Sequence, residues 1–365
     1  MLLSRIDRTN INLWIASITF LALIYFAVAT GIVAAHFPGL GFPCIYSQIV
    51  DYKALNMSLF NVMHQVTPQL FLTDVQMKIY VICTLIIFTF LMFYYIISGT
   101  RVYLNRHNVL KVNQSTKDIK CIGDVSTCYI SDLIMVSFFS FVTSMSFKSP
   151  HLSVFCHTIY LILFLVLVVM LTTRYQSFEK LNFDLQKLHP KLHTTLHFKL
   201  IIINLLQVAL AFATLVTVLT FTLMMGNTLY IRTSTVVFSA LNVFMALFVV
   251  MFLIIEVLLA PYMPMQIGYH FGIFCTLIAL SIAAFQYENI YASKYHTYVM
   301  GNICIMFIVW FVFMAIRCIR IFYHHKSKYH TLASSSPPPP YEEEEHDDVG
   351  SFDEDDEEVI YETPD

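Results

Sequence analysis

Apolar stretches of about twenty residues recur along most of this chain, and they limit its fold more than any other feature. A helix needs about 20 mostly apolar residues to cross the roughly 30 Å hydrocarbon core of a bilayer. Of the 365 residues, 58% are hydrophobic and only 12% are charged. A soluble domain carries roughly 25% charged residues. This composition excludes a water-soluble fold and predicts an all-α polytopic membrane protein.

The pattern predicts eight transmembrane helices in residues 1–316 and a separate tail in residues 317–365. The expected helices span residues 11–35, 79–98, 127–147, 152–173, 200–225, 235–260, 267–287 and 297–316. The third is interrupted by Asp132 and by several Ser and Thr residues. The first is too long for a signal-peptide core and has no clear cleavage site, so we expect it to remain as an anchor.

Basic residues alternate between the connections and predict the orientation. The N-terminus, the second and fourth connections and the tail hold sixteen Lys and Arg residues, whereas the odd-numbered connections hold five. Since cytosolic connections are enriched in Lys and Arg, we expect both termini to be cytosolic. The only large luminal segment is then residues 36–78, between the first two helices.

The predicted luminal segment carries two candidate modification sites. Cys44 is the one cysteine in a luminal loop. A lone luminal thiol indicates an intermolecular disulfide or a reactive free thiol, and a buried unpaired Cys packed on the helix ends is the alternative. The sequon at Asn56 is expected to receive an N-glycan, whereas the sequon at Asn113 is cytosolic and should stay bare.

The tail begins basic and ends with fourteen acidic residues after Tyr341. We expect it to be disordered, because it cannot bury a core. Tyr329 and Leu332 fit the Tyr-x-x-apolar sorting pattern, in which an extended backbone offers both side chains to host sorting adaptors. A cytosolic position near the last helix favours this interpretation over a chance match.

Two further tail patterns have a functional and a structural interpretation each. Pro338, Pro339 and Tyr341 form a Pro-Pro-x-Tyr ligand for WW domains, which would recruit ubiquitin ligases; the alternative is a stiff spacer. Acidic clusters surround Ser351 and resemble a retrieval signal, and the alternative is a solubilising tail. Their members are Glu342, Glu343, Glu344, Glu345, Asp353, Glu354, Asp355, Asp356, Glu357 and Glu358.

We find no catalytic motif and expect neither a cofactor nor a nucleic-acid partner. His189, His193 and His197 recur at helical spacing, as zinc ligands do, but Pro190 interrupts the stretch and no acidic ligand is interleaved. An amphipathic segment at the membrane surface is the favoured interpretation.

Four ionisable residues lie within the predicted helices: Asp132, His157, Glu256 and His270. Intramembrane charges are costly and point to function by default. We expect Asp132 and Glu256 to reach the membrane border, because both lie near helix ends. A transporter or receptor is the alternative class of function, and these two residues would then be essential.

Gly268 and Gly272 are spaced as a helix-packing face, and a chance match explains the spacing equally well.

Several segments resemble the glycoprotein M family of herpesvirus envelope proteins, and betaherpesviruses are the most similar. The longest is His-Phe-Pro-Gly-Leu-Gly-Phe-Pro-Cys-Ile-Tyr at residues 36–46. The others are residues 51–52, 55–58, 113–119, 123–124, 145–147, 188–192 and 268–272. The resemblance covers nearly the whole chain, and eight helices with a charged tail also fit the family.

The resemblance implies a non-enzymatic viral envelope protein that forms a disulfide-linked complex with the small glycoprotein N through Cys44. It also implies roles in secondary envelopment, egress and envelope-protein trafficking. The expected locations are the virion envelope, the host Golgi and trans-Golgi network, endosomes and the inner nuclear membrane. The Pro-Pro-x-Tyr motif is not part of the family pattern.

Overall fold

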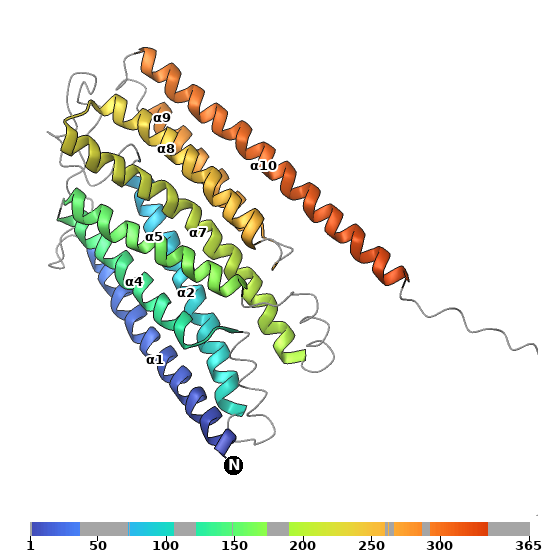
Figure 1. The fold of residues 1–365 in the computed structure, drawn as a ribbon. Helices are drawn as coiled ribbons and strands as arrows, with labels where there is room; N and C mark the ends of the chain where they lie inside the picture. Colours follow the sequence, from blue (N-terminus) through green and yellow to red (C-terminus); the bar gives the residue numbers. More distant parts are fainter. Residues whose placement is uncertain are drawn as a thin grey trace, which may run out of the picture. The chain divides into compact units, whose positions relative to one another are not determined.

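The computed structural model describes residues 2–36, 72, 74–105, 122–147, 149–173, 190–259, 262, 266–286 and 293–334. The long helices in these ranges are α1 (Leu2–His36), α2 (Asp74–Asn105), α4 (Val125–Ser146), α5 (Pro150–Thr173), α7 (Pro190–Leu229), α8 (Thr233–Leu253), α9 (Gly268–Gln286) and α10 (Ser293–Ser334). A π-helix, η3 (Ile254–Leu259), continues α8. Figure 1 shows the helices coloured in chain order.

Eight helices are long and apolar enough to cross a membrane, which confirms the predicted number and class of elements. Several helices extend beyond their apolar stretches. Helix α1 begins at Leu2, and α7 begins at Pro190. Proline favours the first position of a helix, since its missing N–H has no partner there in any case. Pro190 therefore starts a helix. The sequence analysis expected it to interrupt one, and this expectation was wrong.

The C-terminal helix α10 corrects another expectation. It continues past residue 316 to Ser334, so the backbone around Tyr329 is helical and not extended. No Pro or Gly occurs between residues 317 and 336, and Pro337 is the first residue that cannot continue a helix. Residues 335–365 lie outside the described residues.

Helix α7 is the centre of the bundle and contacts α2, α5, α8 and α9. The buried share of its apolar span is 72%, against 17% for α10. On the other side, α1 contacts α2 and α4, and α4 packs against α5. The α10 span therefore exposes most of its apolar surface, as a helix does when it faces lipid.

Contacts between helix ends show that α1, α2, α4, α5 and α7 run in alternating directions. At one end, Trp14 of α1 donates to the carbonyl of Gly123 at 2.8 Å, and Tyr94 of α2 donates to that of Ile122 at 2.9 Å. Both carbonyls lie just before α4. At the other end, Thr228 near the end of α7 lies 3.3 Å from His151 at the start of α5.

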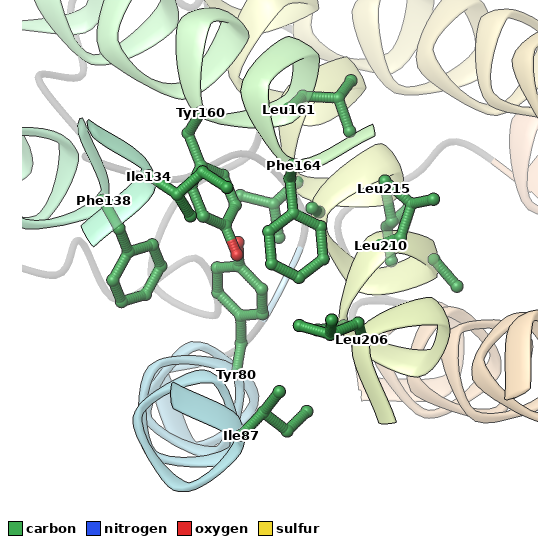
Figure 2. Close-up of a cluster of buried hydrophobic side chains, with 14 of the residues drawn as sticks. Tyr80, Ile87, Ile134, Phe138, Tyr160, Leu161, Phe164, Leu206, Leu210 and Leu215 are labelled. Carbon is green, nitrogen blue, oxygen red and sulfur yellow. The ribbon is translucent and has the colours of Figure 1, made fainter. Parts of the chain in front are cut away.

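Rings from several helices fill the core between α2, α4, α5 and α7, where Tyr80, Phe138, Tyr160 and Phe164 lie together (Figure 2). The aromatic contacts include Phe138 with Tyr160, whose ring centroids are 5.1 Å apart. Buried aromatic pairs of this kind contribute about 0.5–1.5 kcal/mol beyond the area that they bury.

His157 of α5 lies in this core, fully buried, and both of its ring nitrogens are bonded. Nδ1 is 2.7 Å from the Thr217 hydroxyl of α7, and Nε2 is 2.9 Å from the Tyr80 hydroxyl of α2. Since the Thr217 hydroxyl donates to the carbonyl of Ala213, its oxygen accepts a hydrogen bond from Nδ1–H of His157. Nε2 then accepts from Tyr80, so a neutral imidazole joins three helices.

The glycines of α9 allow it to approach α7 closely. A Cβ atom on Gly268 would collide with the backbone carbonyl of Asn204, and one on Gly272 would lie 2.8 Å from the carbonyl oxygen of Val208. The two glycines are therefore a real packing face and not a chance match. Helices in lipid gain stability from such close backbone contact, because lipid supplies no hydrophobic drive for association.

We predict that Gly272→Ala destabilises the protein, because the new methyl group meets α7 backbone that cannot move aside easily. The expected cost is about 1–3 kcal/mol, typical of an overpacked site. Gly301→Ala on α10 is the matched control, since a Cβ there meets nothing within 4 Å. Thermal denaturation of the two variants in detergent checks the prediction, and equal melting temperatures would contradict it.

Candidate functional site

Most of the functional residues predicted from sequence fall outside the part of the chain that the structure describes. Cys44, Asn56 and all tail motifs after Ser334 are in this group. Tyr329 and Leu332 lie in the backbone of α10, one turn apart. The best-defined polar assembly is instead the junction of η3, α9 and α10 around Glu256, which we call the Glu256 junction.

The π-helix η3 places Glu256 at this junction. A π turn contains one residue more than an α turn, so it rotates the side chains that follow, and such turns are frequent at functional sites. Glu256 has only 4% of its surface exposed. Its side chain therefore turns into the bundle and not outward as the sequence analysis expected, because charged partners are available there.

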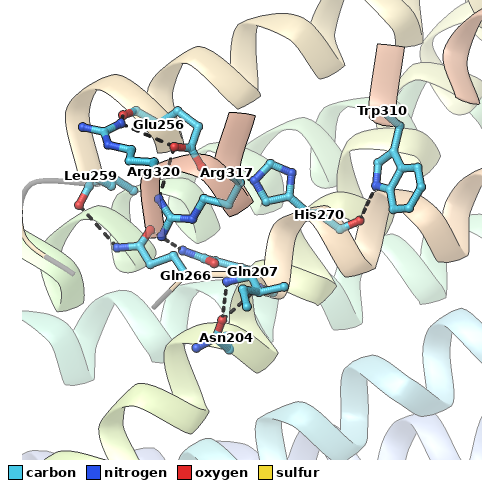
Figure 3. Close-up of polar contacts among 11 residues, drawn as sticks. Asn204, Gln207, Glu256, Leu259, Gln266, His270, Trp310, Arg317 and Arg320 are labelled. Atoms are coloured by element: carbon cyan, nitrogen blue, oxygen red, sulfur yellow. Dashed lines mark hydrogen bonds and ion pairs between the residues drawn. The ribbon is translucent and has the colours of Figure 1, made fainter. Parts of the chain in front are cut away.

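Three side chains hold the Glu256 carboxylate (Figure 3). His270 Nε2 of α9 is 3.2 Å from Oε1, and Arg317 Nη1 of α10 is 3.2 Å from Oε2. Arg320 Nη1 is 3.4 Å from Oε2 and also donates to the Glu256 backbone carbonyl. Arg317 is buried, whereas Arg320 is half exposed. The carboxylate thus binds two guanidinium groups from one helix.

Further contacts hold α10 to its neighbours above this ion pair. Trp310 Nε1 donates to the His270 carbonyl at 2.9 Å (Figure 3). The ring of Phe313 stacks on that of Phe252, with centroids 3.7 Å apart and planes within 6°. Nearer the start of α10, Asn302 donates to Asn242 of α8 at 3.3 Å. Long side chains, more than close backbone packing, therefore attach α10.

A second polar group lies beside the junction, where α9 begins. The Asn204 side-chain oxygen on α7 accepts from the backbone N–H groups of Ile267 at 3.0 Å and Gly268 at 2.8 Å. Gln207 donates to Gln266 at 2.9 Å, and Gln266 donates to the carbonyl of Leu259 at 3.3 Å. These bonds satisfy backbone groups that a helix end leaves free within the membrane.

The contacts of the Glu256 junction are structural, because both carboxylate oxygens bind side chains of neighbouring helices. No cluster of three or more potential metal-ligating His, Cys, Asp or Glu residues occurs in the described ranges. Of the predicted zinc candidates, His189 lies outside those ranges, His193 lies in α7 and His197 is exposed on α7.

Sequence reasoning did not find this junction, although two signals point to it. Glu256 and Arg317 have opposite charges and lie at helix ends that the predicted topology places on the same membrane side. The short, proline-rich connection after η3 also keeps the start of α9 close to the end of α8. Neither signal identifies the partner, since pairing depends on how the helices pack.

Comparison with known proteins identifies relatives over almost the whole chain. The family model for herpesvirus glycoprotein M matches residues 7–333. Envelope glycoprotein M of Murid herpesvirus 1 (strain K181) is 37% identical over 332 residues, which cover 91% of this chain and 94% of that protein. That of Human cytomegalovirus (strain Merlin) is 34% identical over 319 residues, which cover 87% of this chain and 86% of that protein. That of Human herpesvirus 6B (strain Z29) is 36% identical over 329 residues, which cover 90% of this chain and 95% of that protein. No solved structure matches the chain.

We predict that Glu256→Gln strongly destabilises the protein, because it leaves the buried Arg317 guanidinium without a counter-charge. Breaking a buried ion pair costs about 3–5 kcal/mol, whereas replacing both partners with apolar residues costs far less. Glu256→Leu combined with Arg317→Leu should therefore recover part of the loss in melting temperature. Arg232→Gln, at an exposed position, is the control. A Glu256→Gln protein that melts like wild type would show that the ion pair contributes nothing.

Proposed function

We propose a function from one premise: this chain belongs to the glycoprotein M family of herpesviruses. It is a viral envelope glycoprotein that crosses the membrane several times. We infer that it forms a disulfide-linked complex with glycoprotein N and acts in secondary envelopment, egress and the trafficking of envelope proteins. The expected locations are the virion envelope, the Golgi and trans-Golgi network, endosomes and the inner nuclear membrane. Family membership over residues 7–333 is the observation that carries the proposal.

The partnership rests on Cys44, the one cysteine of the proposed luminal segment. Three other cysteines, Cys83, Cys304 and Cys318, are exposed on described helices. Cys83 and Cys304 lie well inside membrane spans, where they could not form a disulfide with a luminal domain. Cys318 lies toward the proposed cytosolic end of α10, where thiols stay reduced. The proposed luminal orientation gives Cys44 an oxidising environment instead.

We predict that Cys44→Ser abolishes the linked species that wild type forms with co-expressed glycoprotein N on non-reducing gels. Cys304→Ser should leave that species intact, because its thiol lies within the membrane. In the same cells, a glycosidase shift that depends on Asn56 and not on Asn113 checks the orientation. A linked species that persists in Cys44→Ser would contradict this covalent assignment.

The proposed trafficking role depends on the cytosolic end of the chain. The adaptor-type motif at Tyr329 and Leu332 lies in the last two turns of α10, so an adaptor that binds extended peptide must first unwind them. Helix ends open at low free-energy cost, and Pro337 lets the helix extend no further. The motif is thus accessible through local fraying. The proline and acidic motifs after it are proposed to recruit WW-domain ligases and retrieval factors.

We predict that Tyr329→Ala shifts the steady-state distribution from the Golgi and endosomes to the cell surface, because the adaptor loses its aromatic anchor. Tyr323→Ala is the matched control, since Tyr323 is exposed on the same helix but has no bulky apolar residue three positions later. Surface biotinylation measures the shift. Identical surface fractions for both variants would remove this motif from the proposal.

A further inference from the structure

Asn302 of α10 is a polar side chain whose hydrogen-bonding groups are satisfied only in part. Its Nδ2 donates to Asn242 Oδ1 of α8 at 3.3 Å, and no other described residue bonds its amide. A side-chain amide has two donor protons and an acceptor oxygen. The side-chain oxygen of Asn204, by contrast, accepts from two backbone N–H groups. Within the described chain, Asn302 therefore keeps an acceptor oxygen and a donor proton for a further partner.

This amide lies inside the membrane, where lipid cannot complete its bonds. Asn302 belongs to the apolar span His296–Tyr323 and is half-buried. Its partner Asn242 lies about 15 Å along α8 from Arg232, the exposed charged residue that precedes that helix. Hydrocarbon supplies neither a donor nor an acceptor. The remaining groups of the Asn302 amide therefore favour contact with another protein helix over contact with lipid.

Asn302 belongs to a regular stripe on the outer side of α10, which we call the α10 stripe. Its members alternate at spacings of four and three residues: Tyr298, Asn302, Ile305, Val309, Val312, Ile316 and Ile319. Five of them are exposed, and Asn302 and Val309 are half-buried. The five members after Asn302 are all Ile or Val. Parallel helices pack along such a heptad seam, and one Asn in the seam fixes their register.

We propose that the chain self-associates in the membrane, with the α10 stripe packed against the same stripe of a second copy. Copies of one chain insert with the same orientation, so their α10 helices are parallel and their Asn302 side chains lie at the same depth. Because an amide is both donor and acceptor, two Asn302 side chains related by a two-fold axis can bond each other. The α10 span is 17% buried, the lowest share among the eight described spans, so this face is open to such a contact.

The test is energy transfer between two differently labelled copies of the full-length chain in lipid vesicles, with no other viral protein present. Self-association gives a signal that rises with the protein-to-lipid ratio and falls when unlabelled chain is added. Asn302→Leu should weaken the association about tenfold, because an interhelical amide contact within lipid is lost. A wild-type signal no greater than that of copies mixed at random overturns the proposal.

Asn242→Leu is the matched control, because it removes the same Asn242–Asn302 bond but keeps the Asn302 amide on α10. It should associate as strongly as wild type does. Circular dichroism confirms that each variant is folded. Equal weakening in both variants would show that the loss comes from the attachment of α10 to α8, and this result also overturns the proposal.

Cysteine cross-linking locates the interface independently. In a chain whose Cys44 and exposed Cys83, Cys304 and Cys318 are replaced by serine, Val312→Cys should form a linked dimer on mild oxidation. Phe311→Cys is the matched control, since Phe311 is 68% exposed at nearly the same depth but points about 100° away from Val312. If Phe311→Cys links as readily as Val312→Cys, the α10 stripe is not the interface.

Discussion

Hydrocarbon offers no hydrogen-bond partner, so polar groups inside a membrane span depend on the protein itself for their partners, and this constraint governs the whole structure. The backbone meets it by forming helices. Most buried Ser and Thr residues meet it by donating to a carbonyl three or four positions earlier, as Thr172 does to Val168 at 2.7 Å. Polar groups that cannot be satisfied within one helix must find a neighbour. The few interhelical bonds at His157, Asn204 and Glu256 therefore specify which helices meet.

The outer helix α10 shows how such bonds add to side-chain packing where close backbone contact is missing. Lipid tails are as apolar as leucine, so apolar side chains alone give a helix little reason to leave lipid for protein. Helix α9 solves this problem with Gly268 and Gly272, which bring its backbone against α7. Helix α10 has no equivalent face toward the bundle, and Gly301 faces open space. Its attachment depends on long side chains: Asn302, Trp310, the two arginines and the Phe313 ring that stacks on Phe252.

The sequence predicted the eight spans because hydropathy is a local property that each helix carries alone. It did not predict the helix ends: Pro190 starts α7 and α10 reaches Ser334, because polar residues beyond an apolar stretch still favour helix until a proline stops it. The expectation that the side chains of Glu256 and Asp132 turn outward to the membrane border was wrong for a different reason, since both are buried in the bundle. Whether a charged side chain turns outward or inward depends on what the neighbouring helices offer, and Arg317 is 61 residues from Glu256 in the chain. The roles proposed for Cys44 and the acidic tail remain predictions, because these residues lie outside the part of the chain that the structure describes.

The two buried carboxylates can be compared directly, since both lie near the same end of the bundle and each belongs to an apolar helix. Glu256 is neutralised by side chains of the protein itself, so its charge fixes helix positions permanently. Asp132 has no such partner in the described chain, and Ser17 and Ser131 direct their protons elsewhere. A buried carboxylate therefore specifies which helices meet only where a neighbouring helix supplies its charged partner, as α10 does for Glu256.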